Sequence, residues 1–271
     1  MVKVSKFFFF VIVVVIIFYS LSPLVMNVIY SFVPGPDVPS ELRLPEKFTL
    51  ENYKTTLFYF APWFPMLNTF VIAISTGFIV LLLAIPAAYA FSRNPSKSFN
   101  GLFFFILIIR MFPLVLLLIP IYFLLKSLHL IDTYFGLILS YLPFNVPLAI
   151  WLLKGFFDGV PREIEEAATI DGASVYCIVR KIMFPLISEG AMAVFFIVFI
   201  YCSFDMICAI TLTRTSVPTL VVKIAGLASG MGAPRFGKIS SMITISLLPF
   251  ICIYILVNKY MAKGFTLNIK G

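Results

Sequence analysis

Residues 7–19 read FFFFVIVVVIIFY, an unbroken apolar run that decides the class of fold. A helix that crosses a bilayer needs about 20 mostly apolar residues, because the hydrocarbon core is about 30 Å thick and each residue adds about 1.5 Å. The apolar character continues past Pro23 to Val33, which gives the required length. The sequence therefore predicts a membrane-spanning helix over residues 7–33.

The composition of the whole chain is that of an integral membrane protein. Of its 271 residues, 61% are apolar and 12% are charged, against about a quarter charged in an average soluble domain. A soluble fold has too few polar groups here to cover its apolar surface. The 14 Gly, 18 Pro without a period and four Cys also exclude collagen-like, disordered and disulfide-scaffold chains.

Six segments are long and apolar enough to span, and their runs are continuous rather than alternating as in a membrane β-barrel. The predicted spans are residues 7–33, 63–91, 102–125, 134–157, 191–212 and 241–260. We therefore predict an all-α polytopic membrane protein, with one transmembrane domain of six helices over residues 1–271.

The basic residues predict the orientation. With both termini inside, 11 of the 20 Lys and Arg residues lie in the cytoplasm, eight lie outside, and Arg110 alone lies well within a span. Lys3 and Lys6 precede the first span, which usually dominates the orientation. No clear small-x-small cleavage site follows this span, so we expect an uncleaved anchor rather than a signal peptide.

Two outer loops are long. Residues 34–62 are expected along the membrane surface, and residues 213–239, which include Gly230 to Pro234, are expected to be irregular or partly re-entrant. Neither loop, nor the rest of the chain, has the G-x-x-x-x-G-K-[ST] spacing of a P-loop. We expect no ATP site of this kind on the chain itself.

The segment 158–190, predicted to be cytoplasmic, has the most distinctive pattern. Residues 161–174 read PREIEEAATIDGAS, which predicts a short helix with Pro161 at its first position and Gly172 as a left-handed stop. Three carboxylates, Glu163, Glu165 and Glu166, fall in the first turns, where the positive end of the helix dipole favours them. A second short helix is predicted over residues 174–184, and Pro185 is expected to end it before the fifth span.

Two interpretations of this segment follow from its residues. Ile164, Ala167 and Ala168 recur at helical spacing and form a small apolar face, which suits docking into a narrow cleft of a partner. The alternative is an amphipathic loop that lies on the membrane. The acidic residues oppose that alternative, because membrane-surface helices favour Lys and Arg.

Part of this segment matches the motif of a known family. Residues 166–173, EAATIDGA, followed by Pro185, resemble the EAA loop of ABC importer permeases. From about residue 49 onward the chain is similar to the sugar-permease branch of that family, which includes a six-span subunit of the maltose system. The similar stretches are LENY at 50–53, AAYAFSR at 87–93, MFP at 111–113 and LIDTY at 130–134. One departure is SFD at 203–205, where the family often carries a Trp-Asn-Glu-like patch.

This resemblance implies a permease subunit of the plasma membrane, for a sugar or oligosaccharide, that works by alternating access. The expected partners are a second EAA-type permease, two copies of a cytoplasmic ATPase that binds ATP and Mg, and an extracytoplasmic solute-binding protein. This chain is then no enzyme and holds no cofactor or metal. The ATPase-coupling positions implied by the motif are Glu166, Ala167, Ala168, Asp171, Gly172, Ala173 and Pro185.

Four polar residues in the predicted spans are candidates for the translocation pathway. They are Arg110, Asp205, Asn68 and Asn145. Ionisable groups inside a membrane usually face a cavity or a partner. For Arg110 and Asp205 three roles stay open: a mutual ion pair, a contact with the partner permease, or contact with the solute.

Other functions remain as alternatives. The chain would then carry glycerol phosphate or another polar solute, or would be a secondary transporter with ion-coupling carboxylates across several spans. A membrane-embedded enzyme needs a catalytic constellation, but the only histidine, His129, falls in a loop. The four cysteines form no C-x-x-C pair and are expected to be buried apolar residues.

Overall fold

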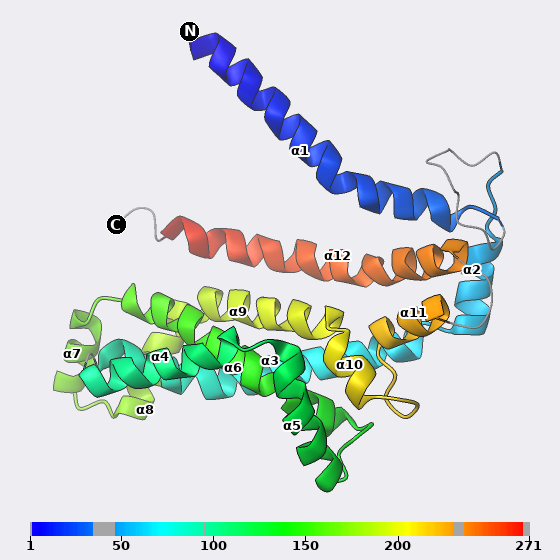
Figure 1. Ribbon diagram of the computed structural model, residues 1–271. Coiled ribbons are helices and arrows are strands. Elements are labelled where there is room, and N and C mark those ends of the chain that lie inside the picture. Colours follow the sequence, from blue (N-terminus) through cyan, green and yellow to red (C-terminus); the bar gives the residue numbers. More distant parts are fainter. Residues whose placement is uncertain (1, 35–46, 95, 230–235, 268–271) are drawn as a thin grey trace. The chain divides into compact units, whose positions relative to one another are not determined.

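The computed structural model describes residues 2–34, 47–94, 96–229 and 236–267, and the elements in these ranges are helices (Figure 1). The longer helices are α1 (Val2–Ser31), α3 (Trp63–Arg93), α4 (Lys97–Met111), α5 (Leu114–Ser127), α6 (Tyr134–Asp158), α9 (Phe184–Phe204) and α12 (Phe236–Leu267). The shorter ones are α2 (Glu51–Thr55), α7 (Glu163–Ile170), α8 (Val175–Cys177), α10 (Ile207–Leu212) and α11 (Leu220–Ser229), with π-helical turns η1 (Thr56–Phe60) and η2 (Ile178–Met183). The predicted all-α fold is confirmed.

Five helices in the described ranges are long and apolar enough to cross a membrane, and there are six such spans if one bent pair of helices is counted as a single span. The five are Phe8–Ser31, Trp63–Arg93, Tyr134–Asp158, Val175–Phe204 and Phe236–Val257. The predicted outer loops are described only in part, because residues 35–46 and 230–235, with Gly230 to Pro234, lie outside the described residues. The loop 213–239 is less irregular than expected, since it contains helix α11.

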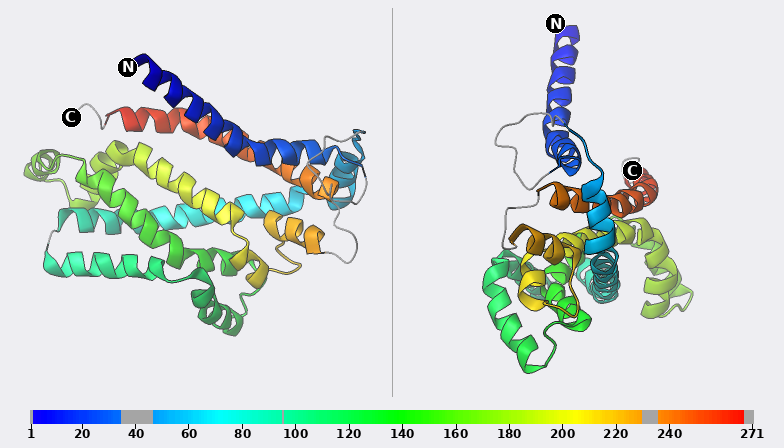
Figure 2. Two further views of the ribbon diagram at one scale, coloured as in Figure 1. Left: turned by 45° about the horizontal axis from the view of Figure 1, so that its top comes forward. Right: turned by 90° about the vertical axis from the view of Figure 1, so that its right-hand side faces the viewer.

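The third predicted span, residues 102–125, is not one straight helix. It consists of α4 and α5, which meet at an angle of 94°, and α5 leaves the line of α4 in both Figure 1 and Figure 2. The break falls at Phe112 and Pro113, both with extended backbone (ψ 136° and 129°). A proline disfavours the helical region for the residue before it, and here that preference prevails.

The fifth predicted span, residues 191–212, has different bounds. One helix runs from Val175 to Phe204 through α8, η2 and α9, so Pro185 does not end a helix as predicted. It lies at the first positions of α9, directly after the π-helical turn η2. A proline disturbs a regular helical ladder, and the wider π turn is a common place to absorb such a disturbance. The helix ends at Asp205, before α10.

By their contacts the residues divide into two compact units. The predicted single domain stays a prediction. The first unit comprises residues 1–64 and 223–251. Asn52 is buried there and donates hydrogen bonds to the carbonyl oxygens of Ser31 (3.0 Å) and Val33 (2.8 Å). The hydroxyls of Thr56 and Ser241 lie 2.6 Å apart. These polar contacts tie the end of α1 to α2, η1 and the start of α12.

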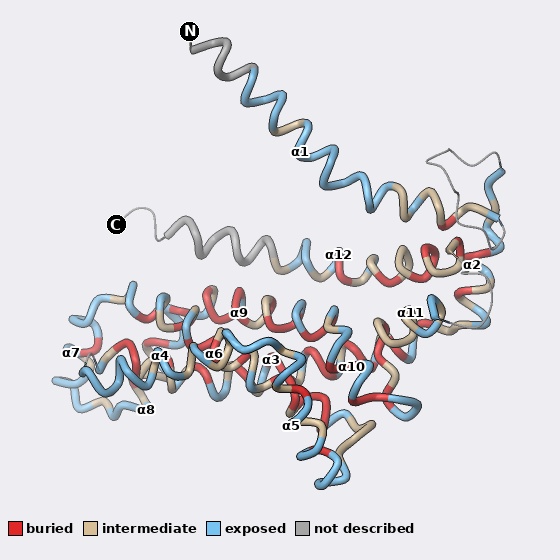
Figure 3. Tube along the Cα trace, in the orientation of Figure 1, coloured by how far each residue is buried: buried red, intermediate tan, exposed pale blue. Residues whose placement is uncertain are grey.

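The second unit comprises residues 65–222 and 252–271 and contains most of the bundle. Its buried positions concentrate on α3, α6 and α9, as Figure 3 shows. Small residues let these helices approach closely, because a Cβ at Gly77 on α3 would lie 2.6 Å from the Phe195 ring on α9. Helix α4 packs on α6. This unit carries every candidate site residue in the chain.

Asp132 fastens the turn between α5 and α6 to the segment after α10. It adopts a left-handed backbone (φ 60°) and its carboxylate accepts hydrogen bonds from four backbone N–H groups, those of Arg214, Thr215, Ser216 and Val217, at 2.7–3.4 Å. Burial acts to raise the pKa of this carboxyl, but the backbone donors outweigh it and hold the pKa well below its usual 3.8. The charged form is therefore stabilised in the folded protein.

We expect Asp132→Asn to lower the free energy of unfolding at pH 7 by about 1–3 kcal/mol, because one carboxylate oxygen is replaced by an NH₂ group that cannot accept. A lowered folded pKa gives stability that is complete above the unfolded pKa and is lost as the pH falls toward the folded one. The difference in melting temperature between wild type and variant should therefore narrow below about pH 4. Thermal unfolding in detergent at pH 7 and pH 3 tests this. The exposed Asp171, changed to Asn, is the control, and an equal gap at both pH values would contradict the prediction.

Candidate functional site

Helix α7 has the local structure that its sequence predicts. Glu163, Glu165 and Glu166 lie in its first turn, and the chain leaves it through Gly172, whose φ is +81°. The N–H groups of Gly172 and Ala173 close the end of the helix on the carbonyls of Thr169 and Ala168. The left-handed stop is thus confirmed. One detail is wrong: Pro161 lies before the N-cap residue rather than at the first helical position.

The next turn begins with the predicted cap. The Ser174 hydroxyl accepts a hydrogen bond from the N–H of Cys177 (3.3 Å). In α7 and the turn after it, the motif residues Glu166, Ala167 and Asp171 are exposed, and Ala168 and Ala173 are half-buried. Apolar side chains are exposed beside them, notably Ile170 at 86% and Tyr176 at 70%. The segment therefore presents a mixed acidic and apolar surface, which we call the α7 surface (Glu166, Ala167, Ile170, Asp171 and Tyr176).

The opposite side of α7 holds a residue whose role the sequence does not reveal. Glu165 is buried and forms an ion pair with Arg93 at the end of α3, with Nε and Oε1 2.5 Å apart. Its second oxygen accepts a hydrogen bond from the Tyr89 hydroxyl (2.8 Å). Glu165 and Glu166 are neighbours, yet one faces the bundle and the other faces outward.

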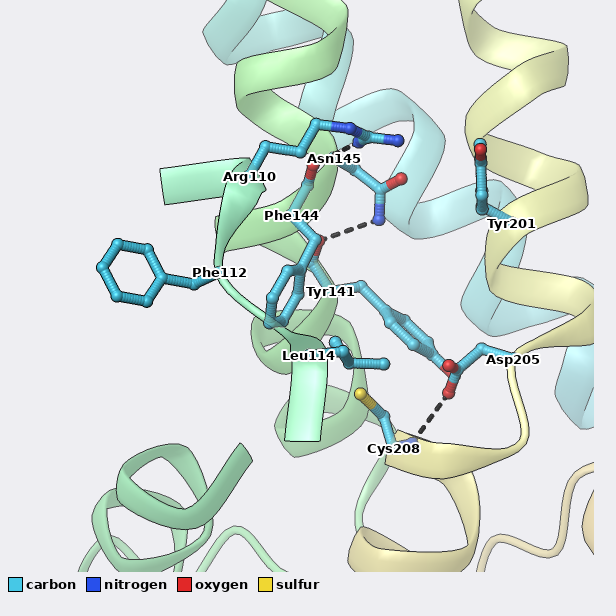
Figure 4. A pocket seen from close by; sticks show the side chains of 9 residues that line it. All are labelled: Arg110, Phe112, Leu114, Tyr141, Phe144, Asn145, Tyr201, Asp205 and Cys208. Carbon is cyan, nitrogen blue, oxygen red and sulfur yellow. Dashed lines mark hydrogen bonds between the residues drawn. The ribbon is translucent and has the colours of Figure 1, made fainter. Parts of the chain in front are cut away.

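A cavity of about 260 Å³ lies within the second unit, among the ends and breaks of several helices (Figure 4). It is lined by Arg110, Phe112, Leu114, Tyr141, Phe144, Asn145, Tyr201, Asp205 and Cys208. These residues come from α4, the break after it, the start of α5, α6, α9 and α10. Three of the four predicted pathway residues therefore share one cavity.

Arg110 is held at one end of this cavity by contacts other than an ion pair, as far as the described residues show. Its guanidinium donates a hydrogen bond to the carbonyl oxygen of Phe144 on α6 (2.8 Å) and lies over the Tyr201 ring at 5.5 Å from the centroid. Figure 4 shows it near the amide of Asn145. A cation stacked on an aromatic ring gains part of the stabilisation that an ion pair would give.

Asp205 binds the backbone at the start of α10. Its Oδ2 accepts hydrogen bonds from the N–H groups of Cys208 (2.9 Å) and Ala209 (3.3 Å), which are the unpaired donors at the start of α10, and from the Tyr141 hydroxyl (3.3 Å). This is the geometry of a helix cap. Although both residues are described, the structure has no ion pair between Arg110 and Asp205, so the mutual ion pair is not formed here.

The two asparagines among the predicted pathway residues lie in different places. Asn145 lines the cavity and donates to the Tyr141 carbonyl (2.9 Å). Asn68 lies elsewhere, buried on α3, where it donates to the Pro218 carbonyl (2.9 Å) and accepts from the Tyr134 hydroxyl (2.6 Å).

The aromatic lining of the cavity, Tyr141, Phe144 and Tyr201, was not singled out by the sequence, since one tyrosine or phenylalanine among many carries no signal. Within the described ranges, no three His, Cys, Asp or Glu side chains gather in an arrangement that could hold a metal ion.

Comparison with known proteins agrees with these features. Residues 80–264 match the family described as binding-protein-dependent transport system inner membrane component. The trehalose transport system permease protein SugB of Mycobacterium tuberculosis is 30% identical over 262 residues, which cover 93% of each protein. The trehalose/maltose transport system permease protein MalG of Thermococcus litoralis is 29% identical over 255 residues, covering 93% of this chain and 92% of the relative.

A solved structure has the same fold. It is a chain from the crystal structure of a bacterial ABC transporter involved in the import of the acidic polysaccharide alginate. The TM-score is 0.76 at 21% identity, and the match covers 95% of this chain and 96% of the other.

The cap at Asp205 leads to a prediction about the two ionisable residues. Asp205→Asn keeps an oxygen that accepts from Cys208, so its stability should stay close to wild type. Asp205→Ala removes the cap and should cost about 0.5–2 kcal/mol. The exchange Arg110→Asp with Asp205→Arg should be no more stable than either single variant, because an arginine at 205 cannot accept from N–H groups. Thermal unfolding of these five variants, the two single variants of the exchange included, by circular dichroism in detergent measures this, and recovery in the exchange variant would show that the residues act as an ion pair.

Proposed function

Because the chain belongs to the family of binding-protein-dependent transport system inner membrane components and is thus a permease subunit of an ABC importer, we propose that its solute is a sugar or oligosaccharide. An extracytoplasmic binding protein delivers the solute, and the permease passes it inward by alternating access. Relatives named for trehalose and maltose transport support the choice of solute class. The protein is a component of the inner membrane with several spanning helices.

The observation that carries the ATP-driven import mechanism is the α7 surface. A short acidic helix with exposed Glu166, Ala167 and Ile170 has the size and chemistry to enter a cleft of a partner. We infer that this partner is a cytoplasmic ATPase, present in two copies, whose basic residues meet Glu166. The predicted orientation, with both termini inside, puts α7 on that side. ATP and Mg then bind on the ATPase, and this chain holds neither.

A second permease with an EAA loop is the remaining partner. Large apolar side chains along α1 are exposed, among them Phe18 at 75% and Tyr19 at 82%. Such surfaces on spanning helices pack against lipid or against other spanning helices. We propose that this chain and its sister permease form a heterodimer that encloses the pathway, and that the cavity at Arg110 and Asn145 belongs to that pathway.

One observation favours a second class of solute. Arg110 lines the cavity and pairs with no carboxylate among the described residues, so a phosphate group would find a cation there. Glycerol phosphate is therefore the alternative substrate.

Reconstitution tests the function. The permease pair, the ATPase and the binding protein, whose genes we expect beside this one, are placed in proteoliposomes. We expect uptake of labelled trehalose or maltose that requires ATP and the binding protein. Uptake of glycerol 3-phosphate but neither sugar would replace the proposed solute, and uptake driven by an ion gradient without ATP would overturn the importer mechanism.

A second prediction concerns Gly172. A β-branched residue at φ +81° is costly, because its side chain collides with the backbone in that region. Gly172→Val should therefore distort the end of α7, so that ATP hydrolysis continues while solute uptake falls at least about fivefold. Gly101→Val is the matched control, since both glycines have open space for a Cβ but only Gly172 has positive φ. Uptake equal to wild type at equal expression would contradict the role of Gly172.

A further inference from the structure

The side of α7 that faces the bundle is fixed to a spanning helix by one carboxylate. Both oxygens of Glu165 are used: Oε1 by the Arg93 guanidinium at 2.5 Å and Oε2 by the Tyr89 hydroxyl at 2.8 Å. Tyr89 and Arg93 are both on α3. The side chains of Arg93 and Glu165 are only 13% and 11% exposed, so water screens this pair less than an ordinary surface ion pair.

The same arginine also holds the chain that leads into α7. Its second nitrogen, Nη2, donates to the Val160 carbonyl (3.1 Å), and Nη1 donates to the Ser92 hydroxyl (3.0 Å). That hydroxyl donates in turn to the Asp158 carboxylate at the end of α6 (2.6 Å). The Arg93 guanidinium on α3 thus contacts α7 and the connecting turn directly, and it contacts the end of α6 through Ser92.

Helix α7 depends on such contacts for its orientation. It has eight residues, and a helix of that length is marginal in water by itself. Short turns join it to α6 and α8, and it also packs on the π turn η2. Glu165 is the buried charged residue in α7, so its ion pair fixes the direction in which the helix presents the α7 surface.

We propose that Glu165, Arg93 and Tyr89 form a coupling clamp, which makes α7 and α3 move as one body when a partner displaces the α7 surface. The three are positioning residues: they touch neither solute nor nucleotide. The transmission of ATPase motion rests on the proposed function, whereas the rigid link between α7 and α3 does not.

Helix α3 connects the clamp to the opposite end of the bundle. It continues for about 36 Å from Arg93 to Thr69 at about 1.5 Å per residue. There the Thr69 hydroxyl accepts from the N–H of Leu220 (2.9 Å), and the neighbouring Asn68 donates to the Pro218 carbonyl (2.9 Å). A displacement of α3 at the clamp therefore reaches the segment before α11 at the other end of the helix.

The rigid link is tested first, by a distance measurement. Spin labels are attached at Glu163→Cys on α7, outside the α7 surface, and at Leu82→Cys on α3, both exposed. The background has serine at Cys177 and Cys252, and the buried Cys202 and Cys208 remain. In the assembled importer in nanodiscs, double electron–electron resonance should give one narrow distance distribution. Glu165→Gln and Arg93→Met should each broaden it at least about twofold, and unchanged widths in both would overturn the clamp.

The control removes a different ion pair at the same end of the bundle. Lys154 and Asp158 lie four residues apart on α6, with side chains 24% and 45% exposed. Lys154→Gln should leave the distance distribution unchanged, because exposed pairs contribute little. An equal broadening in this variant would overturn the specific role of Glu165.

Coupling is tested in the reconstituted importer, with labelled trehalose as the probe. Glu165→Gln should raise the ATP hydrolysed per trehalose imported at least about fivefold, a ratio that a mere loss of folded protein would leave unchanged. Glu165→Asp, which keeps the charge, should recover part of the ratio. The double variant Arg93→Met with Glu165→Gln should be no worse than the single ones, because both remove one interaction.

The outcomes separate the two proposals. Broadened distances with an unchanged ratio of ATP to trehalose would overturn the transmission while leaving the rigid link. Narrow distances in the wild type, together with no ATP-dependent uptake of any sugar by the wild type, would overturn the proposed function and leave the clamp standing.

Discussion

A hydrocarbon environment offers no hydrogen-bond partner to the peptide backbone, so a spanning helix can be interrupted only where protein groups satisfy the freed N–H and C=O groups. In the described part of the second unit, the chain leaves the helical conformation at Phe112–Pro113, inside a bent span, and at Asp205–Met206, where a spanning helix ends before α10. At the second break the Asp205 carboxylate accepts from the free N–H groups of α10. Near the first, Arg110 lies in the last turn of α4 and donates to a carbonyl of α6. Each of the two ionisable residues lies beside one of these breaks, and both line the same cavity.

Length and hydropathy predicted the spans well, because a bilayer imposes a minimum length on each apolar segment. They could not predict which proline interrupts a helix. Pro23, Pro86 and Pro249 lie inside continuous helices, whereas Pro113 stands at a 94° bend. The local sequence around a proline does not decide whether the helix breaks there. Neighbouring helices either satisfy the backbone groups that the proline leaves unpaired, or pack so that the break persists.

The sequence predicted those parts of the candidate site that depend on contacts between sequence neighbours. It did not predict the parts that depend on contacts between residues far apart in the chain. Gly172 and Ser174 act on residues within four positions of themselves, so the sequence of the loop was enough to place both the stop and the cap. Arg93 and Glu165 are separated by 72 positions, and only the packing of α7 under α3 brings them together. For the same reason the shared cavity of Arg110, Asn145 and Asp205 emerged only from the fold.

The division of labour between Glu165 and Glu166 follows from helix geometry. Adjacent residues on a helix point about 100° apart, so a carboxylate fixed to the bundle leaves its neighbour directed outward. The ion pair that uses Glu165 therefore also exposes Glu166 and Ala167. In a chain with only 12 acidic residues, one Glu neutralised by Arg93 orients the helix, and the next keeps its charge for a partner. A single ion pair thereby decides both where α7 is anchored and which surface it offers.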